Sequence, residues 1–115
     1  MLNHSAKLDR AFQALADPVR RGMLARLSRG PASVSQLAEP FRISLPAILQ
    51  HVKALEQSGL AISEKQGRVR TVRLETQTLS EAETWIAHRR TEWEAQLDRF
   101  EVYLQSLKQA ENENG

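Results

Sequence analysis

Residues 33–74 read SVSQLAEPFRISLPAILQHVKALEQSGLAISEKQGRVRTVRL. Within this stretch, Ser33 and Gln36 have the spacing of a capping box, which predicts a short helix over residues 34–39. Pro40 cannot continue that helix, and a second helical pattern begins only a few residues later. The stretch therefore predicts two short helices joined by a tight connection.

The second helix of this stretch is expected to begin after Ser44, with Pro46 in its first turn, where a missing N–H does no harm. Its inward stripe repeats at spacings of three, four and three and consists of Leu45, Ile48, Val52 and Leu55. Ser58 and Gly59 predict its end. The side chains expected to project outward from it are Ser44, Ala47, Gln50, His51 and Lys53.

This outward face suits the major groove of DNA, which is ~12 Å wide and admits a helix whose first-turn side chains are small. Gln50 can pair with adenine, Ala47 can touch a thymine methyl, and Lys53 or the helix N-terminus can hold a phosphate. The alternative interpretation is an ordinary amphipathic surface helix.

Residues 61–75 alternate with the period of two typical of strands, and Gly67 predicts a hairpin turn near their middle. The side chains expected to face the body of the protein are Ile62, Val72 and Leu74. The cations around the turn are Lys65, Arg68 and Arg70. Such a tip suits a finger that lies along a phosphate backbone or in a minor groove, although a charged tip is also common for solvation alone.

Two further helices are expected before this stretch. Residues 7–16 form the first, with Leu8, Phe12 and Leu15 on one face. Asp17 then predicts an N-cap and Pro18 a first helical position. The second helix should run over residues 18–28, and its inward side chains are Val19, Met23 and Leu27.

A long helix is expected over residues 80–108, beginning at a capping box formed by Ser80 and Glu83. Its apolar residues recur every seven positions at Ile86, Trp93, Phe100 and Leu107, with Leu97 and Leu104 between them. So long a helix cannot bury both sides against a small body, so its stripe should meet a second copy, with the helix over residues 7–16 alongside. The expected dimer interface comprises Leu8, Phe12, Ile86, Trp93, Leu97, Phe100 and Leu104.

Two alternatives for this stripe are packing within one chain and a small-ligand pocket lined by Trp85 and Trp93. Residues 109–115 are expected to form a frayed tail. With 115 residues and 41% hydrophobic content, the chain can bury one modest core, so we expect a single domain over residues 1–115 with a core at residues 7–79.

The charge is divided unevenly along the chain. Lys and Arg outnumber Asp and Glu by 12 to 6 in residues 1–79, whereas residues 80–115 hold 4 Lys and Arg against 8 Asp and Glu. The first part would attract a polyanion and the second would be repelled by it. A charge mixture that only aids solubility is the alternative.

The sequence contains no cysteine, which excludes disulfides and thiolate metal sites. No apolar run approaches the ~18 residues that span a bilayer, and the first residues lack an apolar stretch of signal-peptide length. We therefore expect a cytoplasmic protein with no membrane association.

Several of these motifs, taken in order, resemble the ArsR family of bacterial winged-helix repressors. They are LADPVRR (15–21), SLPA (44–47), QHVKALEQSGL (50–60), GRVR (67–70) and WEAQLDRF (93–100). The resemblance implies a mainly α fold with a small β-hairpin, namely a winged helix-turn-helix of five helices with a long C-terminal dimerisation helix. It also implies a homodimer that binds double-stranded DNA and represses transcription.

The same resemblance gives the base-reading role to Ser44, Ala47, Gln50 and His51, and the wing role to Lys65, Arg68 and Arg70. The chain departs from the family pattern at Leu45, Leu49 and Gln50. Leu49 either touches a thymine methyl or packs against a neighbouring helix.

Many members of this family are metal sensors, but the sequence predicts no metal site. The thiolate type needs cysteines near the helix at residues 34–39. A second type, aligned on His88, would place Ile86, Arg99 and Val102 at its other ligand positions. His88 and Glu92 lie one helical turn apart and are interpreted as an exposed pair.

No nucleophile, base and orienting group are arranged for catalysis, and no glycine-rich phosphate loop is present, so we expect neither an enzyme nor a cofactor. The sequence specifies no inducer. The leading hypothesis is a sequence-specific transcriptional repressor that binds a pseudo-palindromic operator as a homodimer. The competing hypothesis is a dimeric winged-helix module that binds an acidic protein partner.

Overall fold

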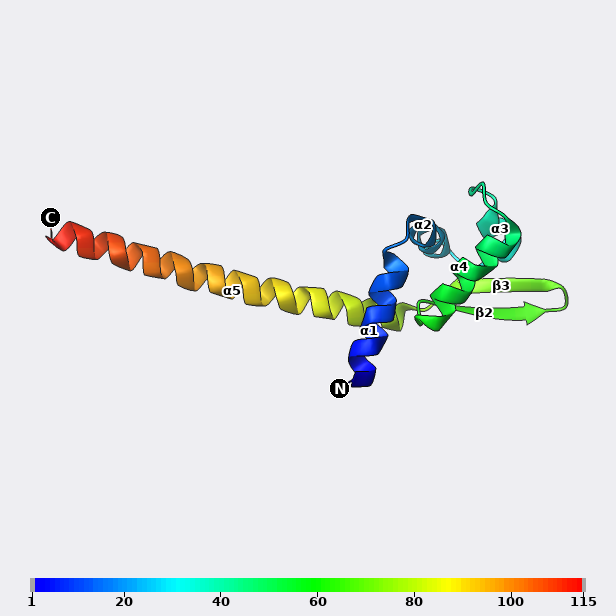
Figure 1. Cartoon of the computed structure of the whole chain (residues 1–115), viewed down its shortest axis with the longest axis horizontal. Coiled ribbons are helices and arrows are strands. Elements are labelled where there is room, and N and C mark those ends of the chain that lie inside the picture. The colour runs from blue at the N-terminus through cyan, green and yellow to red at the C-terminus, as the bar shows by residue number, and fades with distance from the viewer. Residues whose placement is uncertain (1, 115) are drawn as a thin grey trace. The chain divides into compact units, whose positions relative to one another are not determined.

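The computed structural model describes residues 2–114 and the side chains of residues 6–113. The protein is mainly helical and contains a small antiparallel sheet (Figure 1). Its elements in chain order are α1 (Leu2–Leu15), α2 (Pro18–Leu27), β1 (Ala32–Ser33), α3 (Val34–Ala38), α4 (Leu45–Gln57), β2 (Ala61–Gln66), β3 (Val69–Leu74) and α5 (Thr76–Asn114). The chain divides after Ala82 into two compact units. The five helices and the hairpin found in the described residues confirm the expected fold class.

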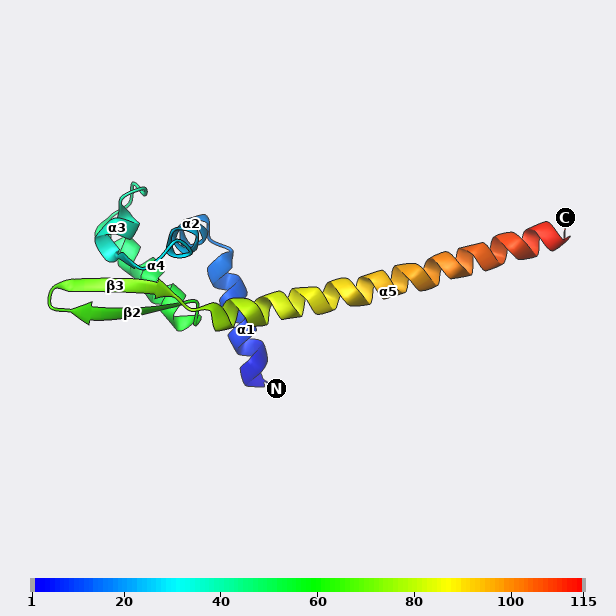
Figure 2. The same cartoon turned by 180° about the vertical axis from the view of Figure 1, so that it is seen from behind.

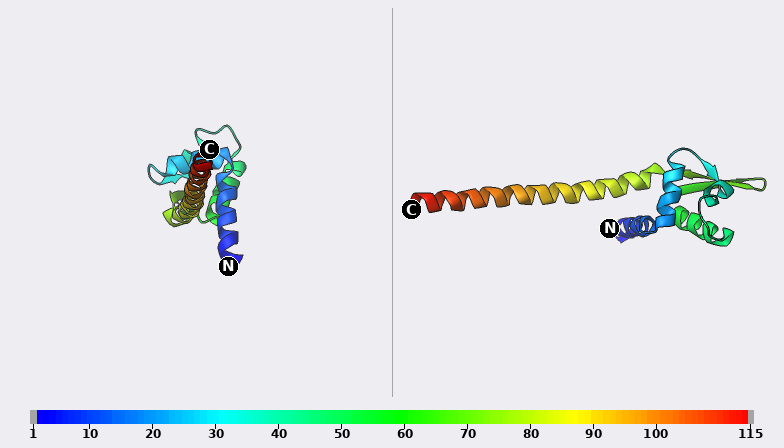
Figure 3. Two further views of the ribbon diagram at one scale, coloured as in Figure 1. Left: turned by 90° about the vertical axis from the view of Figure 1, so that its left-hand side faces the viewer. Right: turned by 90° about the horizontal axis from the view of Figure 1, so that it is seen from above.

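The hydrophobic core of the first unit draws on its helices and its sheet. The largest fully buried side chains are Met23, Leu37, Ile48, Leu55, Leu60 and Val72. Figure 2 shows the β2–β3 hairpin beside α4, and the hairpin tip extends past α3 and α4 in the views of Figures 1 and 3. The base of the hairpin is therefore anchored on the core, while its tip is left for solvent or a partner.

Side-chain caps fix where the helices of this unit begin. The Asp17 carboxylate accepts hydrogen bonds from the N–H groups of Val19 at 2.8 Å and Arg20 at 3.1 Å, ahead of α2. At α3, the Ser33 hydroxyl accepts from the Gln36 N–H, and the Gln36 side chain accepts from the Ser33 N–H. These bonds satisfy N–H groups that the first turn of a helix leaves without a partner. Both caps are confirmed.

The end of α4 is a tight left-handed turn. Gly59 has a φ of 78°. Its N–H donates to the Glu56 carbonyl, and the Leu60 N–H donates to the Leu55 carbonyl. This pair of bonds is a Schellman motif, which ends the helix and turns the chain toward a buried Leu60. Ala61 then begins β2 at once.

The sheet has the strand order β1-β3-β2, with both pairings antiparallel. Gln66 pairs with Val69, so the hairpin closes through the two residues Gly67 and Arg68. Gly67 has a φ of 62°, and no residue other than glycine has a positive φ in the part of the chain that is described, which fits a type II′ turn. At the other end, the Glu75 N–H donates to the Leu60 carbonyl at 2.9 Å and closes the hairpin base.

The pairing register corrects one expectation about the hairpin. Ala61 lies opposite Leu74 and Ser63 lies opposite Val72, so these positions share the face that packs on the core. Ile62 lies opposite Arg73 and therefore points to the other face, where it is half-buried. The expectation that Ile62 joins Val72 against the body was wrong, because neighbouring residues of a strand alternate between faces.

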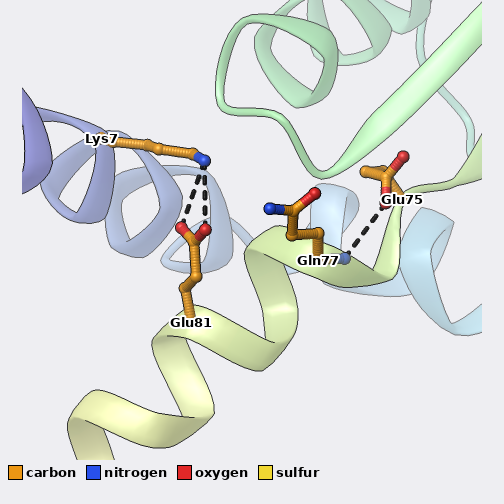
Figure 4. A network of polar contacts seen from close by, with 4 residues as sticks. All are labelled: Lys7, Glu75, Gln77 and Glu81. Carbon is orange, nitrogen blue, oxygen red and sulfur yellow. Dashed lines mark hydrogen bonds and ion pairs between the residues drawn. The ribbon is translucent and has the colours of Figure 1, made fainter.

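Helix α5 begins at Thr76, four residues before the expected start at Ser80. The Glu75 carboxylate accepts from the Gln77 N–H at 3.1 Å and so satisfies an N–H group of the first turn (Figure 4). Thr78 and Ala82 are buried in the first unit, which explains why this early turn forms. The Ser80 capping box was therefore the wrong start.

One ion pair joins α1 to the first turns of α5. The Lys7 ammonium lies 3.2 Å from one Glu81 carboxylate oxygen and 3.3 Å from the other (Figure 4). Because the Lys7 side chain is 45% exposed, water screens the pair, and its contribution to stability should be below about 1 kcal/mol.

The second unit is the remainder of α5. The helix continues to Asn114, whereas we expected it to end near Lys108 and to fray beyond it. Gly115, the last residue of that expected tail, lies outside the described residues. Every side chain from residue 83 to residue 113 is exposed within one protomer. No helix in the described part combines the length and apolar character needed to cross a membrane.

We predict that Gly59→Ala destabilises the protein more than Gly67→Ala. Both changes place a Cβ on a backbone with a positive φ, at a cost of about 1–3 kcal/mol. A Cβ at Gly59 would also lie 2.7 Å from the Thr78 hydroxyl oxygen, whereas a Cβ at Gly67 would meet nothing within 4 Å. Urea denaturation of the two variants measures the difference, and equal losses of stability would show that the crowding against Thr78 is easily relieved.

Candidate nucleic-acid interface

Helix α4 is held by its core stripe, and this sets which of its side chains remain outside. Ile48, Val52 and Leu55 are buried. At ~100° per residue, Gln50 and Lys53 lie on the opposite side of the helix, and both are exposed. The Ser44 hydroxyl accepts from the Ala47 N–H at 3.3 Å, so this exposed residue is also the helix cap.

Ala47 and His51 lie differently from the expectation that they project outward. Both are half-buried. At ~100° per residue they lie on the flank of α4 opposite to Leu45 and Leu49, which border the wing. The His51 Nδ1 lies 3.4 Å from an Arg20 guanidinium nitrogen. Arg20 also donates to the carbonyl oxygens of Ala14 and Gln13, so its guanidinium links the end of α1 to α4. His51 thus helps to hold α4 against the end of α1, and it also forms part of the surface of α4.

The same region holds the cap of α2. The Arg20 N–H lowers the pKa of Asp17 below its ordinary value of 3.8, and the Val19 N–H, the His51 ring and the Arg20 charge act in the same direction. Burial acts against them by raising the pKa. The charged carboxylate is therefore the form that caps the helix.

The wing is the β2–β3 hairpin, and its cations are exposed. Lys65 lies directly opposite Arg70, on the same face of the hairpin as Val72 but beyond the core. Like charges directly opposite each other on a hairpin are destabilising. An anion bound between them would relieve that cost.

A chain of polar contacts connects the wing to α4. Arg70 donates to the Ser63 hydroxyl at 2.8 Å, and the Ser63 hydroxyl donates to the Glu56 carboxylate. Glu56 lies on α4, so the guanidinium of the wing and the helix are held in one hydrogen-bonded arrangement.

A groove of about 350 Å³ lies between the first turns of α4 and the wing. Its lining residues are Ser33, Val34, Ser35, Leu45, Leu49, Lys65, Arg68, Val69 and Arg70. The structure thus brings together the three predicted wing cations. The predicted side chains of α4, which are Ser44, Ala47, Gln50, His51 and Lys53, lie outside this lining.

Leu45 contradicts its expected place in the buried stripe, because it is 54% exposed. The first turn of α4 borders the groove rather than the core at this position. Sequence reasoning missed Val69 as a groove residue and left Leu49 between a thymine methyl and a neighbouring helix. The sequence did carry a signal for this apolar side of the groove. Leu45 and Leu49 are one helical turn apart, so they lie on one side of α4, next to its buried stripe.

In the described part of the chain, no group of three or more His, Cys, Asp or Glu side chains is placed to hold a metal ion. The surface of α4 and the wing presents an exposed helix, guanidinium and ammonium groups, and an apolar strip between them.

A tight helix pair followed by a cationic hairpin defines a winged helix-turn-helix protein. A family described as "Helix-turn-helix domain" matches residues 15–64. The HTH-type transcriptional regulator Rv2034 of Mycobacterium tuberculosis is 40% identical to this chain over 92 residues, which cover 80% of this chain and 76% of Rv2034. The transcriptional repressor SdpR of Bacillus subtilis is 30% identical over 79 residues, which cover 69% of this chain and 88% of SdpR.

Among solved structures, the ArsR family transcriptional regulator RHA00566 superimposes with a TM-score of 0.76 and 49% identity, covering 78% of this chain and 93% of that one. The chain belongs to the ArsR family of transcriptional regulators, as its sequence motifs indicated. It is a DNA-binding regulator of transcription.

We predict that the advantage in stability of the natural protein over its Asp17→Asn variant shrinks in acid. A carboxyl group with a lowered folded pKa stabilises the protein above its unfolded pKa, and this contribution is lost as the pH falls through the folded value. In Asp17→Asn, the side chain still caps the helix but has no charge to titrate. Urea denaturation of both proteins at pH 7 and pH 3 should show a smaller difference at pH 3, and an unchanged difference would contradict the prediction.

Proposed function

We propose that this protein is a repressor that binds a pseudo-palindromic operator as a homodimer. The observation that carries the proposal is the groove in which Lys65, Arg68 and Arg70 of the wing lie beside the first turns of α4. An exposed helix next to three cations suits a duplex, whose bases lie in the major groove and whose phosphates line its edges.

In this proposal, α4 enters the major groove and its exposed Gln50 and Lys53 meet bases or phosphates there. The cations of the wing hold the backbone beside it. Because phosphate contacts supply most of the affinity, the wing would set how tightly the protein binds any DNA, and α4 would set which sequence it prefers. Action on the chromosome requires a cytoplasmic location.

The homodimer is supported by the second unit. Its exposed large apolar side chains include a stripe formed by Ile86, Trp93, Leu97, Phe100, Leu104 and Leu107. At ~100° per residue these positions fall within a sector of about 80° of the helix surface. A narrow stripe of this kind is typical of the seam of a helix pair and so supports the homodimer. Leu8 and Phe12 on α1 are half-buried within the first unit and complete the proposed interface.

Two-fold symmetry then explains the palindrome. A dimer presents two copies of α4, and these reach equivalent positions on half-sites one helical turn apart, about 34 Å along the duplex. The operator should therefore read alike on its two strands.

Selection from random DNA at two salt concentrations tests the function as a whole. We expect enrichment of a palindrome with half-sites about 10 base pairs apart. Weak binding without enrichment at either salt concentration would contradict the operator proposal and favour a module that binds an acidic protein partner.

We predict that Arg68→Ala combined with Arg70→Ala weakens binding to all DNA sequences. Each phosphate that the protein no longer neutralises should reduce the slope of log affinity against log salt by about 0.9. Fluorescence anisotropy with selected and random duplexes measures the slope. The matched control is Arg89→Ala combined with Lys108→Ala, which removes the same formal charge from the second unit and should leave the slope unchanged. An equal slope in the wing variant would refute the wing assignment.

We also predict that Phe100→Asp converts the dimer to monomers, because a carboxylate in the seam would be buried without a partner. Val102→Asp is the control, since Val102 is 67% exposed and lies ~180° around the helix from the centre of the stripe. Analytical ultracentrifugation distinguishes the two species. A dimeric Phe100→Asp variant, or a monomeric Val102→Asp variant, would place the interface elsewhere.

A further inference from the structure

Three apolar side chains line the groove between α4 and the wing and remain exposed to solvent. Leu45 is 54% exposed, Leu49 is 42% exposed and Val69 is 53% exposed. Single exposed apolar residues are ordinary on a protein surface, but a cluster in a groove marks a surface that a partner covers. The groove thus offers apolar contact as well as charge.

The two leucines lie on one side of α4. They are one turn apart, and at ~100° per residue their directions differ by only ~40°, whereas Gln50 points ~100° further round the helix. The leucines therefore face the wing side of any groove that α4 enters, and Gln50 faces its floor or far wall.

The charges around the leucines indicate which kind of partner fits the groove. Lys65, Arg68 and Arg70 line the same groove, and an anion bound there would relieve the repulsion between Lys65 and Arg70. This lining favours a partner that carries several negative charges and also presents small apolar groups. In duplex DNA, the apolar group at a base edge in the major groove is the C5 methyl of thymine.

We propose that Leu45 and Leu49 are specificity-determining residues that recognise thymine methyl groups in the operator. This inference rests on the proposed function and assigns part of the protein's base preference to these two side chains. Cytosine carries hydrogen at the position of that methyl, so removing the methyl leaves each leucine against a gap. One buried methyl is worth about a fourfold change in affinity.

Replacement of thymine by deoxyuridine tests the assignment, because it deletes the methyl and leaves base pairing intact. Each thymine of the selected operator is replaced in turn, on both half-sites together, and affinity is measured at one salt concentration. For the unmodified protein, at least one position in each half-site should lose affinity by about fourfold per half-site.

The leucine variants then assign the methyl to a side chain. Leu45→Ala and Leu49→Ala should each bind the thymine operator more weakly and lose nothing further at the deoxyuridine position that the removed leucine recognises. Both leucines are more than two-fifths exposed, so neither change should alter the melting temperature by much. Ile43→Ala is the control, because Ile43 is 40% exposed but lies outside the groove lining, and it should keep the full deoxyuridine penalty.

Two results would overturn the inference while the proposed function stands. One is salt-dependent binding of the selected operator that no deoxyuridine replacement weakens. The other is a deoxyuridine penalty that both leucine variants retain in full. Failure to select any operator would reject the proposed function and this inference with it.

Discussion

The burial of one side of α4 is the constraint on which the rest of the interface depends. Ile48, Val52 and Leu55 are held in the core, and a helix has no freedom to rotate once three successive turns are fixed. Every other side chain of α4 then has an assigned direction. The buried residues fix the orientation of α4, and this orientation fixes the direction of each polar side chain on its exposed side. The order of polar residues in the sequence therefore determines how they are arranged on the surface.

Hydrogen bonds connect the wing to this helix. Arg70, Ser63 and Glu56 form a hydrogen-bonded chain from β3 through β2 to α4. The guanidinium is thereby restrained before a partner arrives, which reduces the conformational entropy that binding must remove. Lys65 lies directly opposite Arg70 and carries a charge of the same sign, so the two side chains repel each other. In the free wing, the hydrogen bonds of Arg70 order the hairpin, whereas the repulsion between Arg70 and Lys65 destabilises it. An anionic partner would leave the hydrogen bonds in place and remove the repulsion.

The sequence predicted most of what depends on local chemistry. The caps at Asp17 and Ser33 were found because a short polar side chain and the N–H groups it serves are close in the chain. Errors arose where distant segments decide the outcome. Ile62 was placed on the wrong face because strand register depends on pairing partners, and Leu45 was placed in the core because periodicity cannot show where the core ends. Thr76 begins α5 because its first turns are buried by other elements, which a capping motif at a later position could not reveal.

The hydrogen bond from the Glu75 N–H to the Leu60 carbonyl makes the hairpin leave and rejoin the body at one place. The outer part of the hairpin, beyond Val72 and its partner Ser63, can change in length without moving the core. Because strand faces alternate, a change of two residues in each strand preserves the face that carries the cations, whereas a change of one residue in each strand turns it away. Related proteins can therefore extend or shorten the reach of the wing in steps of about 7 Å. Under the proposed function, the length of DNA that the wing covers can thus change independently of the sequence that α4 reads.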